Sequence, residues 1–241
     1  MKEDVAKKLL TKVAEDYETI AGHFSDTRSH QWYEVSRLLN KYIKSKQKVL
    51  DLGCGNGRVA QLVTEIKADY IGLDVSKKLI ALAQNLHPAQ TFVVANMMHT
   101  PFADNSFDHT LLIASLHHLP SAKFRLQTLQ EAKRLTKPGG YIIMTNWNLH
   151  QWRFFISRTK ANLKKIIGNS DLDWNDLLIP WKDQQRQLLA RRYYHGFTKQ
   201  EIKKLAKKAQ LFLYDQYFET RGIHCSRRHG QNLVSVLQKQ P

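Results

Sequence analysis

Short apolar runs of strand length recur along the first two thirds of the chain, and helix-length segments separate them. The runs are VLDL at Val49–Leu52, YIGLD at Tyr70–Asp74, TFVVA ending at Ala95, FDHTLLIAS at Phe107–Ser115 and YIIMT at Tyr141–Thr145. Strands that alternate with helices are typical of a parallel sheet. The pattern therefore predicts an α/β protein with a doubly wound, mostly parallel sheet.

The first apolar run contains a carboxylate, Asp51, and leads into three glycines at alternating positions. Gly53, Gly55 and Gly57 allow a sharp turn and a close approach to a ligand, because they have no Cβ atom. Their spacing, G-x-G-x-G, differs from the dinucleotide fingerprint G-x-G-x-x-G. Asp51 would repel a pyrophosphate at the following helix, whereas it would attract the cationic amino group of S-adenosylmethionine (SAM). The sequence predicts a SAM pocket here, and a tight turn without a ligand is the structural alternative.

Two later strands end in polar residues suited to the same cofactor. Asp74 follows the second strand, where a carboxylate can accept hydrogen bonds from both ribose hydroxyls. Asn96 follows the third strand, where its carbonyl can accept a hydrogen bond from the adenine amino group. Met97 is then expected to lie on the face of the adenine ring.

These residues resemble class I SAM-dependent methyltransferases. The resemblance lies in DLGCGNGR, in GLD ending at Asp74, in M-x-x-x-PF at Met97–Phe102, in SFD at Ser106–Asp108 and in LTKPGG, which stand in that family's order over about residues 45–147. It implies a Rossmann-like fold with a mostly parallel seven-stranded sheet, helices on both faces, and SAM as cofactor. Asn96 departs from the pattern, because many relatives carry Asp there. The residues expected to bind the cofactor are Tyr17, Phe24, Asp51, Gly53, Cys54, Gly55, Asp74, Val75, Asn96, Met97 and Ala114.

Composition agrees with one globular domain. The chain has 241 residues, 42% of them hydrophobic, which is enough for one substantial core. Cys54 and Cys225 give neither a disulfide framework nor a zinc spacing, and the histidines form no metal pattern, so we expect no metal and a reducing, cytoplasmic location. We expect no membrane span and no signal peptide. The predicted division is an N-terminal helical cover (1–45), a SAM-binding core (46–147), a basic insertion (148–197), and a last helix with C-terminal strands (198–241).

Charge is distributed unevenly along the chain, whose net charge is +16. Residues 47–120 contain five Lys or Arg and six acids, whereas residues 151–241 contain eighteen Lys or Arg and seven acids. A basic region beside a neutral catalytic core fits a polyanionic substrate such as RNA. The alternative is a solvated helix face. Lys203–Lys204 and Lys207–Lys208 are separated by one helical turn, and such runs are more often an exposed helix face than a binding site. Thr198 is expected to cap that last helix, which would run to about Lys208.

The segments that flank the core resemble the wobble-uridine tRNA methyltransferases, which esterify the carboxylate of 5-carboxymethyluridine. The matching elements are Y-x-x-I-A-x-H-F-S-x-T-R at Tyr17–Arg28, LHHL at Leu116–Leu119, Trp147, the Pro180–Trp181 pair and R-Y-Y-H-x-F ending at Phe197. The resemblance implies tRNA as a partner and a small zinc-binding activator protein as a further one. The chain departs from the family in two places. The segment between Gln151 and Asp176 is more basic than its family counterpart, and the strand near Asn232–Leu237 lacks paired tryptophans.

The chemistry of that family sets the kind of residue to seek. A carboxylate is ionised at neutral pH, so its attack on the methyl group needs no general base but does need orientation. A guanidinium such as that of Arg28 can hold a carboxylate with two hydrogen bonds, whether that of the uridine or that of the methionine part of SAM, and aromatic rings can hold a splayed base. Only one of two adjacent arginines on regular structure needs to face the site. The candidate catalytic and substrate-binding residues are Arg28, His117, Trp147, Arg191, Arg192, Tyr194 and His195.

Two other functions remain compatible with the same core. A methyltransferase acting on a small, quinone-like molecule would need an apolar lid in place of a basic, aromatic insertion. A SAM-binding protein that interacts with RNA without turnover would bind the cofactor but not consume it.

Overall fold

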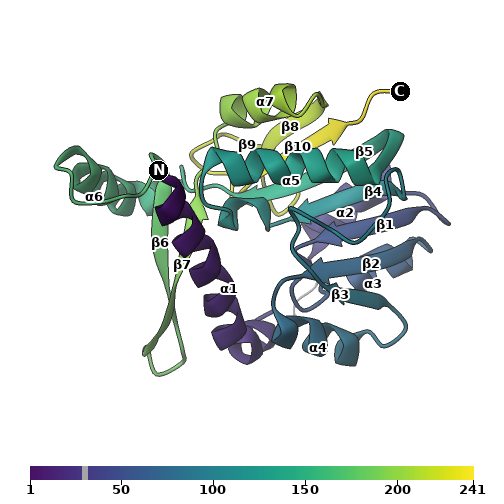
Figure 1. Ribbon diagram of the computed structural model, residues 1–241, viewed down its shortest axis with the longest axis horizontal. Helices are drawn as coiled ribbons and strands as arrows, with labels where there is room; N and C mark the ends of the chain where they lie inside the picture. The colour runs from purple at the N-terminus through teal and green to yellow at the C-terminus, as the bar shows by residue number, and fades with distance from the viewer. Residues whose placement is uncertain (29–31) are drawn as a thin grey trace.

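One large sheet forms the centre of the molecule in the computed structural model, which describes residues 1–28 and 32–241 (Figure 1). Its strand order is β3-β2-β1-β4-β5-β10-β8-β9. The five strands from β3 to β5 are parallel, and β10 runs antiparallel to both β5 and β8. The strands of this sheet are β1 (Lys48–Leu52), β2 (Asp69–Asp74), β3 (Thr91–Val94), β4 (Phe107–Ile113), β5 (Thr136–Trp147), β8 (Phe212–Thr220), β9 (Ile223–Cys225) and β10 (Asn232–Gln238).

The predicted doubly wound sheet is confirmed, with one strand more than the seven expected. The additional strand, β9, has three residues, pairs antiparallel with β8 and forms the edge of the sheet. So short a strand gives no alternating pattern in the sequence, which is why it was not anticipated. The sequence K-P-G-G at Lys137–Gly140 predicts a turn before the fifth strand, but these residues form the first part of β5, next to an irregularity in its register with β4.

Helices cover both faces of the sheet (Figure 1). They are α1 (Glu3–Asp26), α2 (Tyr33–Tyr42), α3 (Ala60–Glu65), α4 (Lys77–Leu86), α5 (Ala122–Leu135), α6 (Phe155–Ile166) and α7 (Lys199–Lys208), with short 3₁₀ turns η1 (Leu116–His118) and η2 (Trp152–Phe154). The polar sequence between the first helix and Trp32 predicts a loop, and residues 29–31 of that segment lie outside the described residues.

Two apolar cores lie on the two faces of the sheet, because successive strand residues point in opposite directions. In β5, for example, Ile142 and Met144 join the core that contains residues of α5 and α7, whereas Ile143 joins the core that contains residues of α2, α3 and α4. All three side chains are fully buried. This two-sided burial explains why the central strands appear in the sequence as continuous apolar runs.

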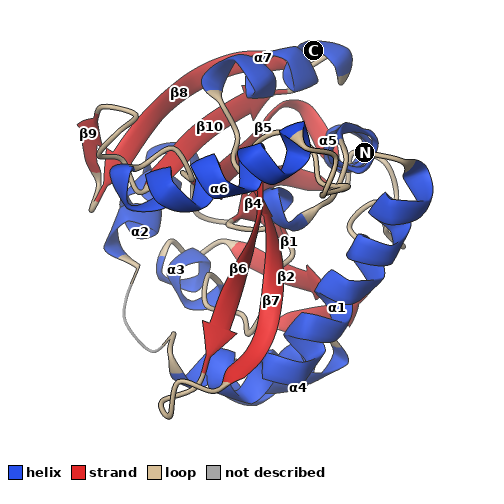
Figure 2. Ribbon diagram, turned by 90° about the vertical axis from the view of Figure 1, so that its left-hand side faces the viewer, coloured by secondary structure: helices blue, strands red, loops and turns tan. Residues whose placement is uncertain are grey.

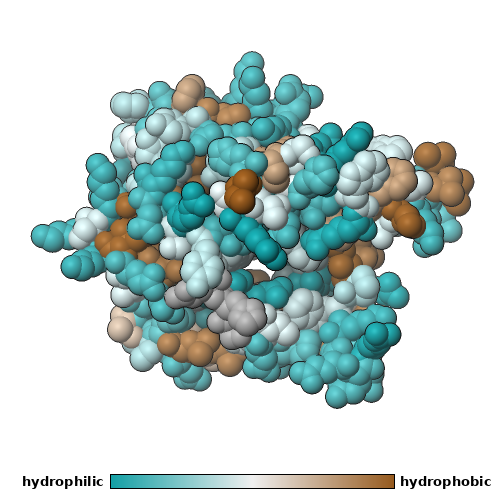
Figure 3. Space-filling model, turned by 180° about the vertical axis from the view of Figure 1, so that it is seen from behind, coloured by the Kyte–Doolittle hydropathy of each residue, from teal (hydrophilic) through white to brown (hydrophobic). Residues whose placement is uncertain are grey.

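Residues 148–197, the predicted basic insertion, form a unit beside the main sheet. The unit contains η2, α6 and a two-stranded antiparallel sheet made of β6 (Asp176–Lys182) and β7 (Leu188–His195). Figure 2 shows this hairpin standing across the end of the central sheet, with α1 beside it. Hydrophilic side chains cover most of the face seen in Figure 3, whereas hydrophobic ones gather at its right-hand edge, where α6 lies. The hairpin and α1 together enclose the region described next.

The last helix begins as predicted. The Oγ1 atom of Thr198 accepts a hydrogen bond from the backbone N–H of Glu201 at 3.1 Å, which is the geometry of a helix N-cap. The helix that follows ends at Lys208, and its lysines at positions 203, 204, 207 and 208 are exposed. The expected solvated basic face of this helix is therefore present.

Candidate functional site

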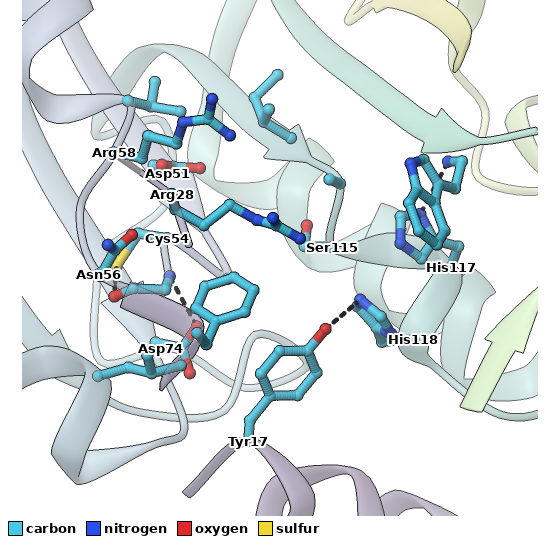
Figure 4. A pocket seen from close by; sticks show the side chains of 18 of the residues that line it. Tyr17, Arg28, Asp51, Cys54, Asn56, Arg58, Asp74, Ser115, His117 and His118 are labelled. Carbon is cyan, nitrogen blue, oxygen red and sulfur yellow. Dashed lines mark hydrogen bonds between the residues drawn. The ribbon is translucent and has the colours of Figure 1, made fainter. Parts of the chain in front are cut away.

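A pocket of about 390 Å³ lies where the carboxyl ends of the central strands meet α1 and the β6–β7 hairpin (Figure 4). Most of the residues expected to bind a cofactor or a substrate line it together, although they come from segments far apart in the sequence. Those that line it are Tyr17, Phe24, Arg28, Asp51, Gly53, Cys54, Gly55, Asp74, Val75, Met97, Ala114, His117, Trp147, Arg192 and Tyr194.

The glycine loop brings the backbone close to this pocket. Gly53, Gly55 and Gly57 all have positive φ angles, of 80°, 58° and 76°. A Cβ atom on Gly53 would lie 2.6 Å from the Cβ atom of Ser115, which no folded protein tolerates without rearrangement. At Gly55 the nearest atom to such a Cβ would be 3.7 Å away, on the ring of Phe24. The glycines are therefore required by backbone conformation, and the first also by close packing.

Asp51 lies at the floor of the pocket with one oxygen paired and one unpaired. Its Oδ2 atom accepts a hydrogen bond from the hydroxyl of Tyr70 at 2.9 Å, whereas Oδ1 is buried without a partner among the described residues. Burial raises the pKa of Asp51 to about 7, although the Tyr70 hydrogen bond opposes the shift. A cationic amino group beside Oδ1 would restore the ionised form, so this carboxylate fits the methionyl end of SAM.

Asp74 closes the opposite side of the glycine loop. Its Oδ2 atom accepts from the backbone N–H of Gly55, and its Oδ1 atom accepts from that of Ser76, both at 2.9 Å. These bonds fix the orientation of the carboxylate, while each oxygen keeps a second lone pair for a ribose hydroxyl. Burial raises the pKa of this group as well.

The other expected cofactor residues take different positions. The thiol of Cys54 is buried, which raises its pKa, so the residue is suited to filling space and not to acting as a nucleophile. Ala114 adopts a positive φ of 54°, and its N–H donates to the Oγ1 atom of Thr145 at 3.1 Å. Asn96 does not line the pocket: its side chain is exposed and accepts from the backbone N–H of Met98 at 2.9 Å. The expected contact between Asn96 and adenine therefore stays a prediction.

The side of the pocket next to η1 and β7, here named the acceptor side, is built from stacked aromatic rings. The ring of Tyr194 stacks on His117 at 5.2 Å and on Trp147 at 5.1 Å between centroids. Tyr194 is almost fully buried, so these neighbours occupy the positions at which a base would have to stack. Trp147 is only partly buried and keeps part of its surface towards solvent. Trp147 is therefore the better placed of the two for stacking on a base.

Alternation along β7 separates the remaining candidates. Arg192 is 4% exposed and lines the pocket, whereas Arg191 is exposed and points to the other side of the strand. His195 shares the side of Arg191 and lies outside the pocket. Its Nδ1 atom is 2.6 Å from Asp176 and its Nε2 atom 2.7 Å from Glu201, so it connects the hairpin to α7. Arg191 and His195 are thus not brought into the site.

Sequence reasoning missed several residues that line or border this pocket. His118 lies between Tyr17 and β7, with its Nε2 atom 2.8 Å from the Tyr17 hydroxyl. The ring of Trp181 lies 4.2 Å from the Arg192 guanidinium and donates a hydrogen bond to His23 at 2.9 Å. Arg58 lines the pocket and stacks on Trp32 at 4.2 Å. The motifs LHHL and P-W contained two of these residues, but their orientation depends on how the hairpin meets α1.

The described residues contain neither a cluster of metal-binding side chains nor a membrane-spanning helix. Over residues 1–28 and 32–241 no group of three or more His, Cys, Asp or Glu side chains is arranged to hold a metal ion. Within the same residues no helix has the length and apolar character needed to cross a bilayer.

Comparison with known proteins identifies the class. Residues 50–144 match the family model described as a methyltransferase domain. A SAM-dependent methyltransferase structure from Methanosarcina mazei superimposes with a TM-score of 0.70 at 20% identity, covering 84% of this chain and 97% of that one. A putative methyltransferase from Haloferax volcanii, solved in complex with the Trm112 methyltransferase activator, gives a TM-score of 0.66 at 17% identity, covering 95% and 98%. The fold and the pocket are those of a class I SAM-dependent methyltransferase.

Proteins of similar sequence identify the family within this class. The tRNA (carboxymethyluridine(34)-5-O)-methyltransferase of Schizosaccharomyces pombe is 31% identical over 211 residues, which are 80% of this chain and 85% of that protein. The Arabidopsis thaliana protein of the same name is 34% identical over 148 residues, and the match spans 61% of this chain and 35% of that longer protein. The chain belongs to the tRNA (carboxymethyluridine(34)-5-O)-methyltransferase family. It is an enzyme whose cofactor is SAM.

Proposed function

We propose that this protein transfers a methyl group from SAM to the carboxylate of a 5-carboxymethyl-type uridine at the wobble position of tRNA, giving a methyl ester. The sulfonium of bound SAM supplies the electrophilic methyl group. The protein's own contribution is to bind the cofactor through Asp51, Asp74 and the glycine loop, and to hold one carboxylate oxygen towards the methyl group.

A pair of guanidinium groups that have no counter-ion among the described residues carries this proposal. Arg28 and Arg192 both line the pocket, and neither forms an ion pair with a carboxylate of the described residues. Burial and the nearby charge of Arg192 lower the pKa of Arg28, so the two cations disfavour each other. A bound anion would relieve this repulsion and the cost of burying a charge. A carboxylate on the substrate has the charge and the planar shape that guanidinium groups bind best.

The histidines of the pocket support an acceptor that needs no deprotonation. The backbone N–H of Trp147 donates to the Nδ1 atom of His117 at 3.2 Å, so a neutral His117 carries its proton on Nε2 and acts as a donor. Burial lowers the pKa of His117 well below its usual value. The carboxylates that line the pocket are Glu34, Asp51 and Asp74, which belong to α2 and the cofactor strands. An acceptor that is already ionised is consistent with this set of groups.

The rival small-molecule function is less well supported. It requires an apolar lid, whereas the hairpin presents Arg192 and Trp181 to the region above the pocket. The exposed lysines of α7 and the basic residues of the insertion would add sequence-independent affinity for phosphates. We therefore retain tRNA as the proposed partner and the cytoplasm as the proposed location.

An activator subunit is part of the same proposal. The Haloferax volcanii structure pairs a similar fold with the Trm112 activator, and the resemblance of this chain to wobble-uridine enzymes implies a small zinc-binding partner of that kind. The requirement is tested by measuring methyl transfer with and without a co-expressed Trm112-type protein from the same organism. A rate that does not change on its addition would remove the partner from the proposal.

Transfer of labelled methyl from SAM to tRNA tests the reaction. The tRNA comes from a strain that lacks this gene, and half of the product is treated with mild alkali. Label that enters the tRNA and is released by alkali indicates an ester, whereas label that resists alkali excludes the carboxylate as acceptor. A failure to label tRNA with the activator present, together with normal binding of S-adenosylhomocysteine (SAH), would favour binding without turnover.

A matched pair of variants on one strand connects the assay to the site. Arg192→Ala removes the buried cation of β7, and Arg191→Ala removes the same charge from its exposed neighbour. We expect R192A to lower kcat/KM about 100-fold, the scale of losing charge-assisted bonds to the acceptor, and R191A to keep kcat at saturating tRNA. Equal losses in both variants would mean that charge on β7 acts only through general attraction.

A further inference from the structure

A chain of hydrogen bonds joins the hairpin, η1 and α1 along the acceptor side of the pocket. The Nδ1 atom of His118 lies 3.0 Å from the backbone carbonyl oxygen of Tyr193. The Nε2 atom of His118 lies 2.8 Å from the hydroxyl of Tyr17 (Figure 4). The Nη1 atom of Arg192 lies 3.3 Å from the same hydroxyl oxygen.

The direction of every bond in this chain follows from its two ends. A carbonyl oxygen can only accept, so Nδ1 of His118 must carry a proton. In a neutral imidazole Nε2 is then an acceptor, and the Tyr17 hydroxyl must donate to it. The lone pairs of the Tyr17 oxygen are left to accept from Arg192, which can only donate. The Tyr17 hydroxyl therefore accepts a hydrogen bond from Arg192 while its own proton points towards Nε2 of His118.

We propose that His118 is a positioning residue, which acts through Tyr17 to hold the Arg192 guanidinium in place for the anionic group of the substrate. The proposal rests on the proposed function, because it assigns Arg192 to the acceptor carboxylate. Arg192 is 4% exposed, and its Nε–H has no partner among the described residues. Tyr17 thus satisfies one donor of Arg192 with a neutral acceptor, and the positive charge stays available for the substrate.

The arrangement requires a neutral His118, and its surroundings favour that form. The groups packed against its ring are Tyr17 from α1, His117 from η1 and Tyr194 from β7, with the cation of Arg192 nearby. Burial and the charge of Arg192 lower the pKa of His118 to about 3, against the opposing hydrogen bond to Tyr193. If His118 were protonated, Nε2 would become a donor, the Tyr17 hydroxyl would turn, and its proton would face Arg192.

The first experiment measures the tautomer directly and does not depend on activity. Long-range ¹H–¹⁵N correlation spectra of the ¹⁵N-histidine-labelled full chain report which ring nitrogen carries the proton, and His118 is assigned by the loss of its signals in His118→Gln. We expect the Nδ1–H tautomer, with no change between pH 5.5 and 8.5. An Nε2–H tautomer, or a midpoint inside this range, would overturn the proposal whether or not tRNA is the substrate.

The second experiment measures whether the effect of His118 passes through Tyr17. His118→Phe removes the acceptor, His118→Gln restores one through its amide oxygen, and Tyr17→Phe removes the hydroxyl. We expect H118F and Y17F each to lower kcat/KM for tRNA about tenfold, H118Q to recover most of the loss, and H118F to leave the Kd for SAH unchanged. In the Y17F background H118F should cause no further loss, because the pathway is already broken.

The outcomes separate this inference from the proposed function. If the two losses of kcat/KM multiply in the Y17F/H118F double variant, His118 acts independently of Tyr17, and the proposal is refuted. Normal activity of H118F would refute it as well. If the wild-type enzyme does not methylate tRNA, the proposed function is refuted instead. The tautomer of His118 then still tests the direction of the hydrogen bonds from His118 through Tyr17 to Arg192.

Discussion

The buried carboxylate of Asp51 makes folding stability and cofactor binding depend on pH in opposite ways. The pKa of this group rises from 3.8 to about 7 in the folded protein, mainly because of burial. The folded state therefore binds the proton more tightly than the unfolded state does. The stability associated with the protonated form is present below pH 3.8 and is lost as the pH rises through 7.

The size of the effect follows from these two pKa values. Between pH 5 and pH 8 the linkage relation gives a loss of about 2.5 kcal/mol of unfolding free energy from this one carboxyl group. Asp51→Asn removes the titration but keeps an oxygen for Tyr70, so the stability of the variant minus that of the wild type should increase by about 2.5 kcal/mol over the same range. Its absolute value also contains the cost of the new, buried N–H donors, which does not vary with pH.

Urea unfolding without cofactor measures this difference at pH 5 and pH 8. Asp69→Asn is the matched control, because Asp69 begins the neighbouring strand β2 and is exposed. We expect the difference for D69N to stay constant within error. A D51N difference that is the same at both pH values would mean that Asp51 is not titrating as its burial requires.

Cofactor affinity supplies the opposite half of the prediction. A cationic amino group binds the ionised carboxylate, so below pH 7 Asp51 must lose its proton on binding. The Kd for SAH should therefore increase up to about tenfold for each unit by which the pH falls below 7, and D51N should show weak binding without this dependence. A wild-type Kd for SAH that does not change between pH 5.5 and 7.5 would show that Asp51 does not bind the amino group.

Three further changes test single features of the structure. Gly53→Ala places a Cβ atom 2.6 Å from that of Ser115 at a φ of 80°, so SAH binding in calorimetry should be lost and the melting temperature lowered; a normal Kd would contradict the close packing. Thr198→Ala removes the cap on the N–H of Glu201 and should cost about 1 kcal/mol in urea unfolding, with no loss refuting the cap. His195→Ala removes one partner from each of two carboxylates, Asp176 and Glu201, and should cost about 3 kcal/mol, whereas a variant as stable as the wild type would show that this link between the hairpin and α7 does not stabilise the fold.

The cofactor half of the site could be predicted from the sequence because its signals are local. The glycine loop, Asp51 and Asp74 each follow an apolar run, and the ends of parallel strands meet at one edge of the sheet. The Thr198 cap is local in the same way. The position of Asn96 outside the pocket lining was not foreseen, because a side chain in a turn can bond to the backbone two residues later, as this one does to Met98.

The acceptor half could be predicted only as a set of residue types. Whether Arg191 or Arg192 faces the pocket depends on which side of β7 packs against α1, and this is decided by contacts between segments far apart in the sequence. The role of His118 depends on the same contacts, since its partners Tyr17 and Tyr193 come from α1 and β7. His195 appeared in the same motif as Arg192, but strand alternation turns it towards α7.

The two halves of the pocket are not connected by a shared ladder of hydrogen bonds. Among the described residues, β6 and β7 pair only with each other, while Asp51 and Asp74 lie in β1 and β2 of the eight-stranded sheet and the glycine loop directly follows β1. Mutations in the hairpin can therefore accumulate without disturbing the strands that bind SAM. In evolutionary terms, the acceptor specificity of this enzyme can diverge while the methyl donor stays the same.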